Sequence, residues 1–176
     1  MGHYTETQLI SQMQLYPKLN DRGRSQKCAT ELNEFEANTM IYSMFAMALL
    51  TFTVAGYLLK LRVAAVRNGD VKLSSFRLNN RDDMPAALIQ ASRNYSNLFE
   101  MPLLFYCTVI VTVVLHLDNL FMLVLSWLFV ASRLVHSWVH LTSNNVIRRM
   151  QAFMVGNLCI FLMWIILIWK YTISAY

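Results

Sequence analysis

The chain has 176 residues, of which 56% are apolar and only 14% are charged. Ordinary soluble domains are ~45–50% apolar and ~25% charged, so this composition argues against a soluble globular protein. The net charge of +5 would also suit a nucleic-acid-binding protein, but the basic residues are scattered and form no recognised nucleic-acid motif. The cysteines, Cys28, Cys107 and Cys159, are far apart and predict neither a disulfide framework nor a metal site.

After a polar N-terminal tail, residues 1–38, the chain contains apolar segments long enough to cross a membrane. About 20 apolar residues in a helix cross the ~30 Å hydrocarbon layer. The predicted spans are residues 40–59, 94–117, 120–141 and 153–169. The connector between the second and third spans is so short that these two helices must be antiparallel neighbours. The sequence therefore predicts an all-α integral membrane protein, with a four-helix domain over residues 39–176.

The distribution of Lys and Arg predicts how this domain is oriented in the membrane. Nine of these residues lie in the first and third loops, against five on the side of the termini. Cytoplasmic loops carry an excess of Lys and Arg. We therefore predict that loops one and three are cytoplasmic and that both termini lie outside, in the inner or plasma membrane if the protein is bacterial.

Polar residues in the second and third spans form the candidate site. A charged side chain within a span costs ~2.5–3.5 kcal/mol on insertion scales, so Glu100 and Arg133 require an explanation. In the second span, Arg93, Asn97 and Glu100 are spaced i, i+4, i+7, which places them on one helix face. Pro102 follows them and predicts a kink.

In the third span, the spacing of Arg133, His136 and His140 is i, i+3, i+7, again that of a single face. Since the two helices are antiparallel, we expect the polar faces to overlap in depth and to form a polar chamber at the cytoplasmic end. Arg148 and Arg149, at the entrance to the fourth span, add two guanidinium groups at the same level. Such a site suits a small ligand with several carboxylates and one ammonium group.

Simpler interpretations remain open for each of these residues. Glu100 and Arg133 are also explained by a buried ion pair that fixes the helix register. The arginines at the span ends, Arg93, Arg148 and Arg149, also fit as positive-inside anchors. His136 and His140 also fit as helix-packing residues. A lone side chain is explained well in these ways, but the coincidence of two polar stripes and an arginine pair at one depth is not.

These motifs resemble those of the MAPEG family, the membrane-associated proteins in eicosanoid and glutathione metabolism. The main match is R-x-x-x-N-x-x-E, present as Arg93 to Glu100 and followed by proline. The second match is R-x-x-H, from Arg133 to His136, and the third is Arg149, which lies at the family's spacing from Arg133. A weaker match is Gly69 to Leu73, which is similar to the first-loop segment G-x-V-R-L with Lys72 in place of arginine. Where eicosanoid enzymes carry tyrosine this chain has His140, which is more similar to the bacterial branch.

The resemblance implies a four-helix bundle that assembles as a homotrimer, with glutathione as co-substrate bound between subunits and a lipophilic second substrate that enters from the bilayer. It implies glutathione contacts from Arg93, Asn97, Glu100, His136, His140, Lys72 and Arg148. Arg149, supported by Arg133, is implied as the catalytic arginine that stabilises the thiolate.

The function expected from this resemblance is that of a glutathione transferase or peroxidase that acts on lipophilic electrophiles or lipid hydroperoxides. The alternative is a non-catalytic lipid-binding membrane scaffold of the same family, which would bind a fatty acid but form no thiolate. A small transporter is disfavoured because the polar groups gather at one depth, and only Thr108, Thr112 and His116 continue toward the outer face.

Overall fold

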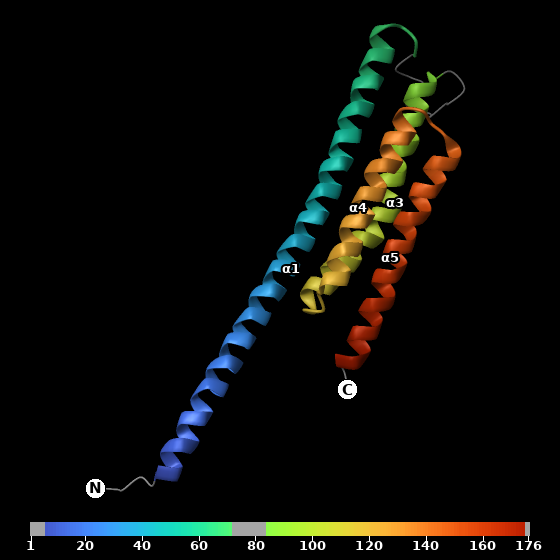
Figure 1. The fold of residues 1–176 in the computed structure, drawn as a ribbon. Helices are drawn as coiled ribbons and strands as arrows, with labels where there is room; N and C mark the ends of the chain where they lie inside the picture. Colours follow the sequence, from blue (N-terminus) through green and yellow to red (C-terminus); the bar gives the residue numbers. More distant parts are fainter. Residues whose placement is uncertain (1–5, 72–83, 175–176) are drawn as a thin grey trace.

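The computed structural model describes residues 6–71 and 84–174, with side chains placed mainly from residue 36 onward. These residues form four helices, α1 (Glu6–Arg67), α3 (Ala86–Val114), α4 (Leu120–Leu141) and α5 (Val146–Ser174) (Figure 1). Each contains a stretch long and apolar enough to cross a membrane. The prediction of an all-α, four-span membrane protein is therefore confirmed.

The helices are longer than most of the predicted spans. The third span has the predicted bounds, Leu120–Leu141, and its 22 residues extend about 33 Å. Helix α3 starts before the predicted second span and continues through Pro102, and α5 extends the fourth span at both ends. The part of α1 suited to the membrane is Glu36–Arg67.

Helix α1 also includes most of the segment that the sequence marks as a polar tail. It runs without a break from Glu6 to Arg67, over 62 residues. The part that precedes Glu36 would extend roughly 45 Å at 1.5 Å per residue. In Figure 1 this blue part of α1 projects past the end of the bundle, on the side where the C-terminus lies.

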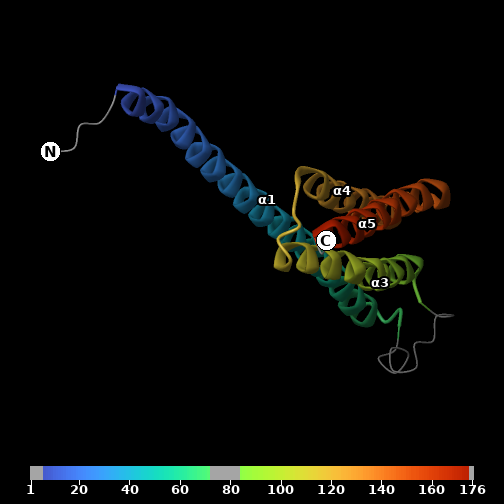
Figure 2. The ribbon, with the colours of Figure 1, turned by 90° about the horizontal axis from the view of Figure 1, so that it is seen from below.

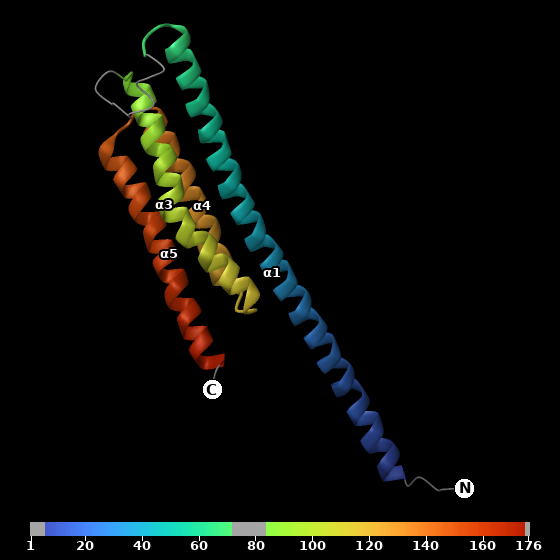
Figure 3. The ribbon, with the colours of Figure 1, turned by 180° about the vertical axis from the view of Figure 1, so that it is seen from behind.

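Two helix pairs make up the bundle. Helix α4 packs along α5 and α1 packs along α3, while α3 also contacts α4 and α5 (Figure 2). The C-terminal end of α1, the start of α3 and the α4–α5 turn lie together at one end (Figure 3). The α3–α4 turn lies at the opposite end with the two termini. The first and third connections therefore face one side of a membrane, as four spans require.

The interior is apolar along most of its length. Phe105 of α3 stacks on Phe129 of α4 with ring centroids 4.5 Å apart, and Met122 and Met163 are fully buried. Most buried hydroxyl groups donate to carbonyl oxygens of their own helices, as Thr112 does to Thr108 at 2.8 Å. Toward the end that carries the α4–α5 turn, the interior also contains buried amide, guanidinium and imidazole groups, those of Asn94, Arg133, His136 and His140.

At the opposite end of the bundle, a lysine connects α5 to the α3–α4 turn by hydrogen bonds. Lys170 of α5 donates from Nζ to the carbonyl oxygens of Leu117 and Asp118, at 3.0 and 3.2 Å. These carbonyls lie in the turn between the C-cap of α3 at Leu115 and the N-cap of α4 at Asn119. Asn119 then begins α4 by accepting a hydrogen bond from the backbone N–H of Met122 at 2.8 Å. Lys170 therefore fastens α5 to the α3–α4 turn.

Candidate functional site

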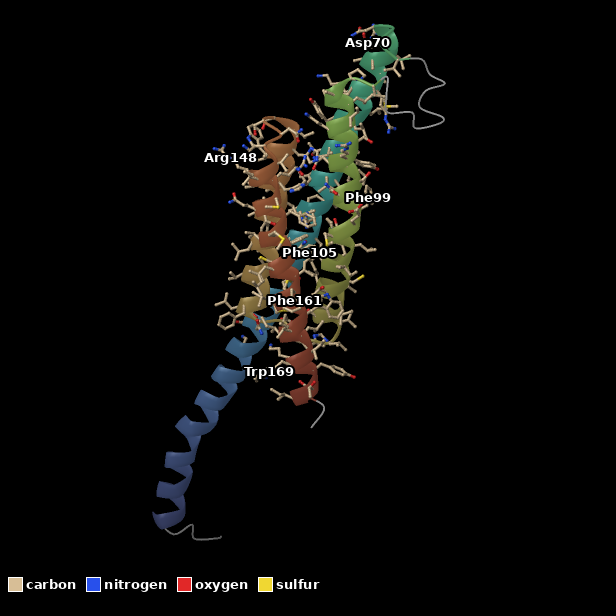
Figure 4. The ribbon with its side chains drawn as sticks, turned by 90° about the vertical axis from the view of Figure 1, so that its right-hand side faces the viewer. Asp70, Phe99, Phe105, Arg148, Phe161 and Trp169 are labelled. Atoms are coloured by element: carbon tan, nitrogen blue, oxygen red, sulfur yellow. The ribbon has the colours of Figure 1, made fainter. Side chains whose placement is uncertain are left out.

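A polar stripe follows the inward face of α4 toward the α4–α5 turn. Arg133, His136 and His140 are 1%, 3% and 1% exposed, respectively. Their side chains share one helix face, as their spacing predicts, and that face points into the bundle. Figure 4 shows nitrogen atoms gathered between the helices toward this end, above Phe105.

Arg149, in the first turns of α5, makes the densest set of polar contacts at this end. Its Nη1 donates to Oδ1 of Asn144 at 2.7 Å and approaches Nε2 of His140 at 3.4 Å. Its backbone carbonyl oxygen lies 3.0 Å from Nδ1 of His136. Among the residues that the structure describes, no carboxylate pairs with this half-buried guanidinium. Its permanent positive charge is therefore not neutralised by a neighbour.

The contacts of Arg149 also fix the tautomers of the two histidines. A carbonyl oxygen only accepts, so the Nδ1 of His136 must carry a proton. A guanidinium only donates, so the Nε2 of His140 must offer a lone pair, and the ring of His140 is neutral. The other ring nitrogens, Nε2 of His136 and Nδ1 of His140, are buried and have no hydrogen-bond partner among the described residues.

Arg133 lies deeper, between two aromatic rings. Its guanidinium carbon is 5.1 Å from the centroids of both Phe129 and Phe153. Its Nη2 donates to Oδ1 of Asn157 on α5 at 3.2 Å, whereas Nε and Nη1 have no hydrogen-bond partner in residues 6–71 and 84–174. Cation–π contacts of this kind contribute most where water is excluded. Arg133 therefore joins α4 to α5 in the interior, and the sequence did not single out its partner Asn157.

Gly156 of α5 provides the space for Arg133. A Cβ at this position would lie 2.6 Å from Oγ of Ser132 and 3.3 Å from Nε of Arg133. The close approach of α4 and α5 therefore depends on a residue without a side chain. The sequence did not predict this role, because glycine is required here by the close approach of α4 and not by anything within α5 itself.

Near the start of α3, at this end of the bundle, the buried polar residue is Asn94, which the sequence analysis missed. It is fully buried, and its Oδ1 accepts from Oγ of Ser137 at 3.3 Å. Asn97 is half-buried, and Arg93 and Glu100 are exposed. The expected chamber, enclosed between the polar stripes of α3 and α4, is therefore wrong for a single chain.

The rotation of α3 about its own axis explains why its polar stripe does not enclose a chamber in the single chain. Its inward face is built from residues at helical spacing, all apolar except Asn94: Leu88, Ala91, Asn94, Leu98, Pro102 and Phe105. Arg93 and Asn97 each precede a member of this series by one residue, which is a rotation of about 100°. The Arg93–Asn97–Glu100 stripe therefore shares one face as predicted, but that face lies on the outside of the single chain.

The polar stripe of α4 thus lies inside the bundle, and the polar stripe of α3, called the outer stripe below, lies on its surface. Glu100 is exposed and Arg133 pairs with Asn157, so the alternative of a buried Glu100–Arg133 ion pair is also wrong. Arg93 still lies close enough to His140 to act on its ring electrostatically. The outer stripe therefore reaches the same level of the bundle as the α4–α5 turn.

The remaining predicted residues lie at this end or outside the described residues. The Arg148 side chain is exposed, and its backbone N–H donates to Oδ1 of Asn145 at 3.1 Å, a cap on the first turn of α5. Lys72 falls outside the residues that the structure describes. Of the segment from Gly69 to Leu73, Gly69 adopts a φ of +78° where α1 ends, and Val71 is buried.

An apolar pocket opens between α1 and α3, and its α3 residues interleave along the helix with those of the outer stripe (Arg93, Asn97 and Glu100). Its volume is about 320 Å³. It is lined by Ala48, Thr51, Phe52, Ala55, Tyr95, Leu98, Phe99, Leu103 and Tyr106. Tyr95 and Phe99 meet edge to face, with centroids 4.9 Å apart. Because the lining residues belong to membrane-spanning parts of α1 and α3, the pocket lies at bilayer depth.

The fold and this cluster define a four-span integral membrane protein with an arginine- and histidine-rich site at one end of its bundle. The sequence profile of the MAPEG family matches residues 40–169, which include all four predicted spans. The chain therefore belongs to the MAPEG family. No match was found among curated proteins or solved structures.

Proposed function

We propose that the protein is a membrane-bound, glutathione-dependent transferase or peroxidase that works through an arginine-stabilised thiolate. The observation that carries this proposal is the environment of Arg149. Its guanidinium is half-buried and contacts an amide oxygen and a neutral imidazole rather than a carboxylate. An unneutralised cation in a partly dry site is suited to hold an anion such as a thiolate.

The required shift in acidity is modest. An ordinary thiol with a pKa of about 8.5 is only about 3% thiolate at pH 7. A guanidinium beside the sulfur favours the charged form and lowers the thiol pKa by one or more units, each equivalent to about 1.4 kcal/mol. Because arginine does not lose its proton, Arg149 would supply this field at every physiological pH.

The thiolate would then react with a lipophilic electrophile in one of two ways. In the transferase reaction, the sulfur forms a bond to an electrophilic carbon while the bond to the leaving group breaks. In the peroxidase reaction, the sulfur attacks the terminal hydroperoxide oxygen, the O–O bond breaks, and the lipid leaves as an alcohol after protonation. A second glutathione then displaces water from the resulting sulfenic acid to give the disulfide.

The outer stripe on α3 supports a site shared between subunits. Glu100, at bilayer depth, is exposed on the single chain, where an unpaired carboxylate is costly. A glutathione ammonium group paired with Glu100, and carboxylates near Arg93, would compensate these charges. A second copy packed on this face would exclude lipid from them. We therefore include the homotrimer implied by the family resemblance in the proposal.

The direct test is turnover by the detergent-purified protein, with its assembly state measured in the same preparation. We expect saturable consumption of glutathione with an aryl halide or a fatty-acid hydroperoxide, by a complex whose native mass corresponds to three chains. A preparation that binds no glutathione would contradict the proposal, and an active single chain would contradict the shared site.

The pocket between α1 and α3 favours the second candidate, a non-catalytic lipid-binding scaffold. Its lining is almost entirely apolar and lies at bilayer depth, which suits the acyl chain of a fatty acid. The two candidates differ in whether glutathione is ionised and consumed. If the protein is a scaffold, we expect a fatty acid to bind in the pocket, Phe52→Ala to weaken that binding, and no glutathione to be consumed in the turnover assay.

The orientation in the membrane is part of the proposal and has its own test. With nine Lys and Arg residues on the loop side against five on the other, we expect the α4–α5 turn to be cytoplasmic and the C-terminus to be outside. Ser143 and Ser174 are exposed at opposite ends of the bundle. In a cysteine-free background, an impermeant maleimide added to intact cells should label the Ser174→Cys variant. It should label the Ser143→Cys variant only after permeabilisation, and the reverse pattern would invert the assignment.

A further inference from the structure

Asn144, in the α4–α5 turn, makes the shortest contact to the Arg149 side chain, at 2.7 Å. Its backbone is held in the left-handed region, with a φ of +47°, and its N–H donates to the carbonyl oxygen of Val139 at 2.8 Å. The backbone of the turn therefore aims the Asn144 amide oxygen at the guanidinium.

Few residue types can meet both requirements of this position. Glycine adopts the left-handed conformation readily but has no oxygen to offer. Most other residues are strained there, whereas Asn and Asp tolerate it. Aspartate would place a negative charge 2.7 Å from the guanidinium and neutralise it. Asparagine is the residue that orients Arg149 and leaves its charge available.

The other contacts of Arg149 have the same character. His140 offers only a neutral lone pair, and His136 holds the backbone carbonyl of Arg149 rather than its side chain. Arg149 is thus fixed at its backbone and at one guanidinium nitrogen, Nη1. Within the described part of the chain, hydrogen bonds reach only Nη1 of the guanidinium, which leaves Nε and Nη2 to contact a bound anion.

We propose that Asn144 is a positioning residue, which fixes the Arg149 guanidinium by a neutral acceptor so that its charge acts on the bound thiol. This inference rests on the proposed function, because the effect of Asn144 is transmitted through Arg149. It also assigns His140 a role within the protein, as a second acceptor for Arg149, in place of a direct contact with glutathione.

The test compares variants that separate conformation, hydrogen bonding and charge. Asn144→Gly keeps the backbone conformation and removes the acceptor, whereas Asn144→Asp keeps the acceptor and adds a negative charge. Asn145→Ser is the matched control, because serine also caps α5 and Asn145 does not contact the guanidinium. For each variant, the ultraviolet absorbance of the thiolate is titrated against pH with glutathione bound, and kcat and KM are measured.

We expect Asn144→Gly to raise the pKa of the bound thiol and to lower kcat at pH 7 by roughly three- to tenfold, with KM little changed. Asn144→Asp should have the larger effect, although it retains the hydrogen bond, and Asn145→Ser should titrate as the wild type. A merely structural role would instead lower the melting temperature and leave the titration unchanged.

The outcomes distinguish this inference from the proposed function. If Arg149→Ala abolishes the thiolate while both Asn144 variants titrate as the wild type, the positioning role is wrong and the proposed function stands. If Arg149→Ala itself keeps the thiolate, the proposed function fails, and the role of Asn144 fails with it.

Discussion

Replacing Arg149 by alanine is expected to return the pKa of bound glutathione to about 8.5, the value of an ordinary thiol. At pH 7 the thiolate fraction would fall to about 3%, and kcat would fall at least tenfold if the wild-type thiol pKa lies near 7 or below. The guanidinium is half-buried at the start of α5 and has no carboxylate partner among the described residues. Its removal therefore leaves no buried charge behind.

Two further observations make this prediction specific. Arg149→Lys keeps the charge but replaces a planar donor with a point charge, so we expect part of the rate to return. Raising the pH should restore much of the Arg149→Ala rate, because the thiol then ionises without assistance. A variant that is equally slow at high pH would show that Arg149 acts in some way other than by ionising the thiol.

Of the substitutions considered, replacing Gly156 by leucine is expected to cause the largest decrease in the stability of the folded protein. Even a Cβ at this position would approach Oγ of Ser132 to 2.6 Å and Nε of Arg133 to 3.3 Å. A larger side chain must push α4 and α5 apart or displace Arg133 from Asn157. Overpacking of this kind costs about 1–3 kcal/mol, which should lower the melting temperature by several degrees.

Gly56 provides the matched control for this substitution. It also lies in a membrane-spanning helix, but a Cβ there would meet nothing within 4 Å in the single chain. We expect Gly56→Leu to melt close to the wild type in detergent when helicity is followed by circular dichroism. Equal melting temperatures for Gly156→Leu and the wild type would show that the close packing of Arg133 against α5 is not required.

The fold was predictable from the sequence because a bilayer restricts what a chain can form. Uncharged segments of this length must be helices that cross the membrane, since the backbone has no other way to satisfy its polar groups there. The bounds Leu120–Leu141 were predicted correctly because short polar connectors flank them. The helical continuation of α1 to Glu6 was not predicted, because a polar segment gives no apolar periodicity from which to infer a helix.

The site was predictable only in part. Spacing identifies residues that share a helix face, which was correct for His136 and His140 and for the stripe of Glu100. It does not say which way that face turns. On α3 the inward direction is set by packing against the other helices, and the buried residue is Asn94 rather than Asn97.

Three contributors to the site had no sequence signal. Asn144 depends on a left-handed turn, Gly156 on the approach of α4, and Asn157 on the position of Arg133. The requirement on Asn144 comes from the backbone of its own turn, and those on Gly156 and Asn157 come from the neighbouring helix α4. Their roles become visible only when the helices are placed side by side.

The most direct test of the account is the ultraviolet absorbance of the thiolate when glutathione is added to the purified protein at neutral pH. The account predicts a saturable thiolate signal that titrates at least one unit below 8.5 and that Arg149→Ala loses. Saturable glutathione binding without thiolate absorbance would contradict it and would favour the lipid-binding scaffold.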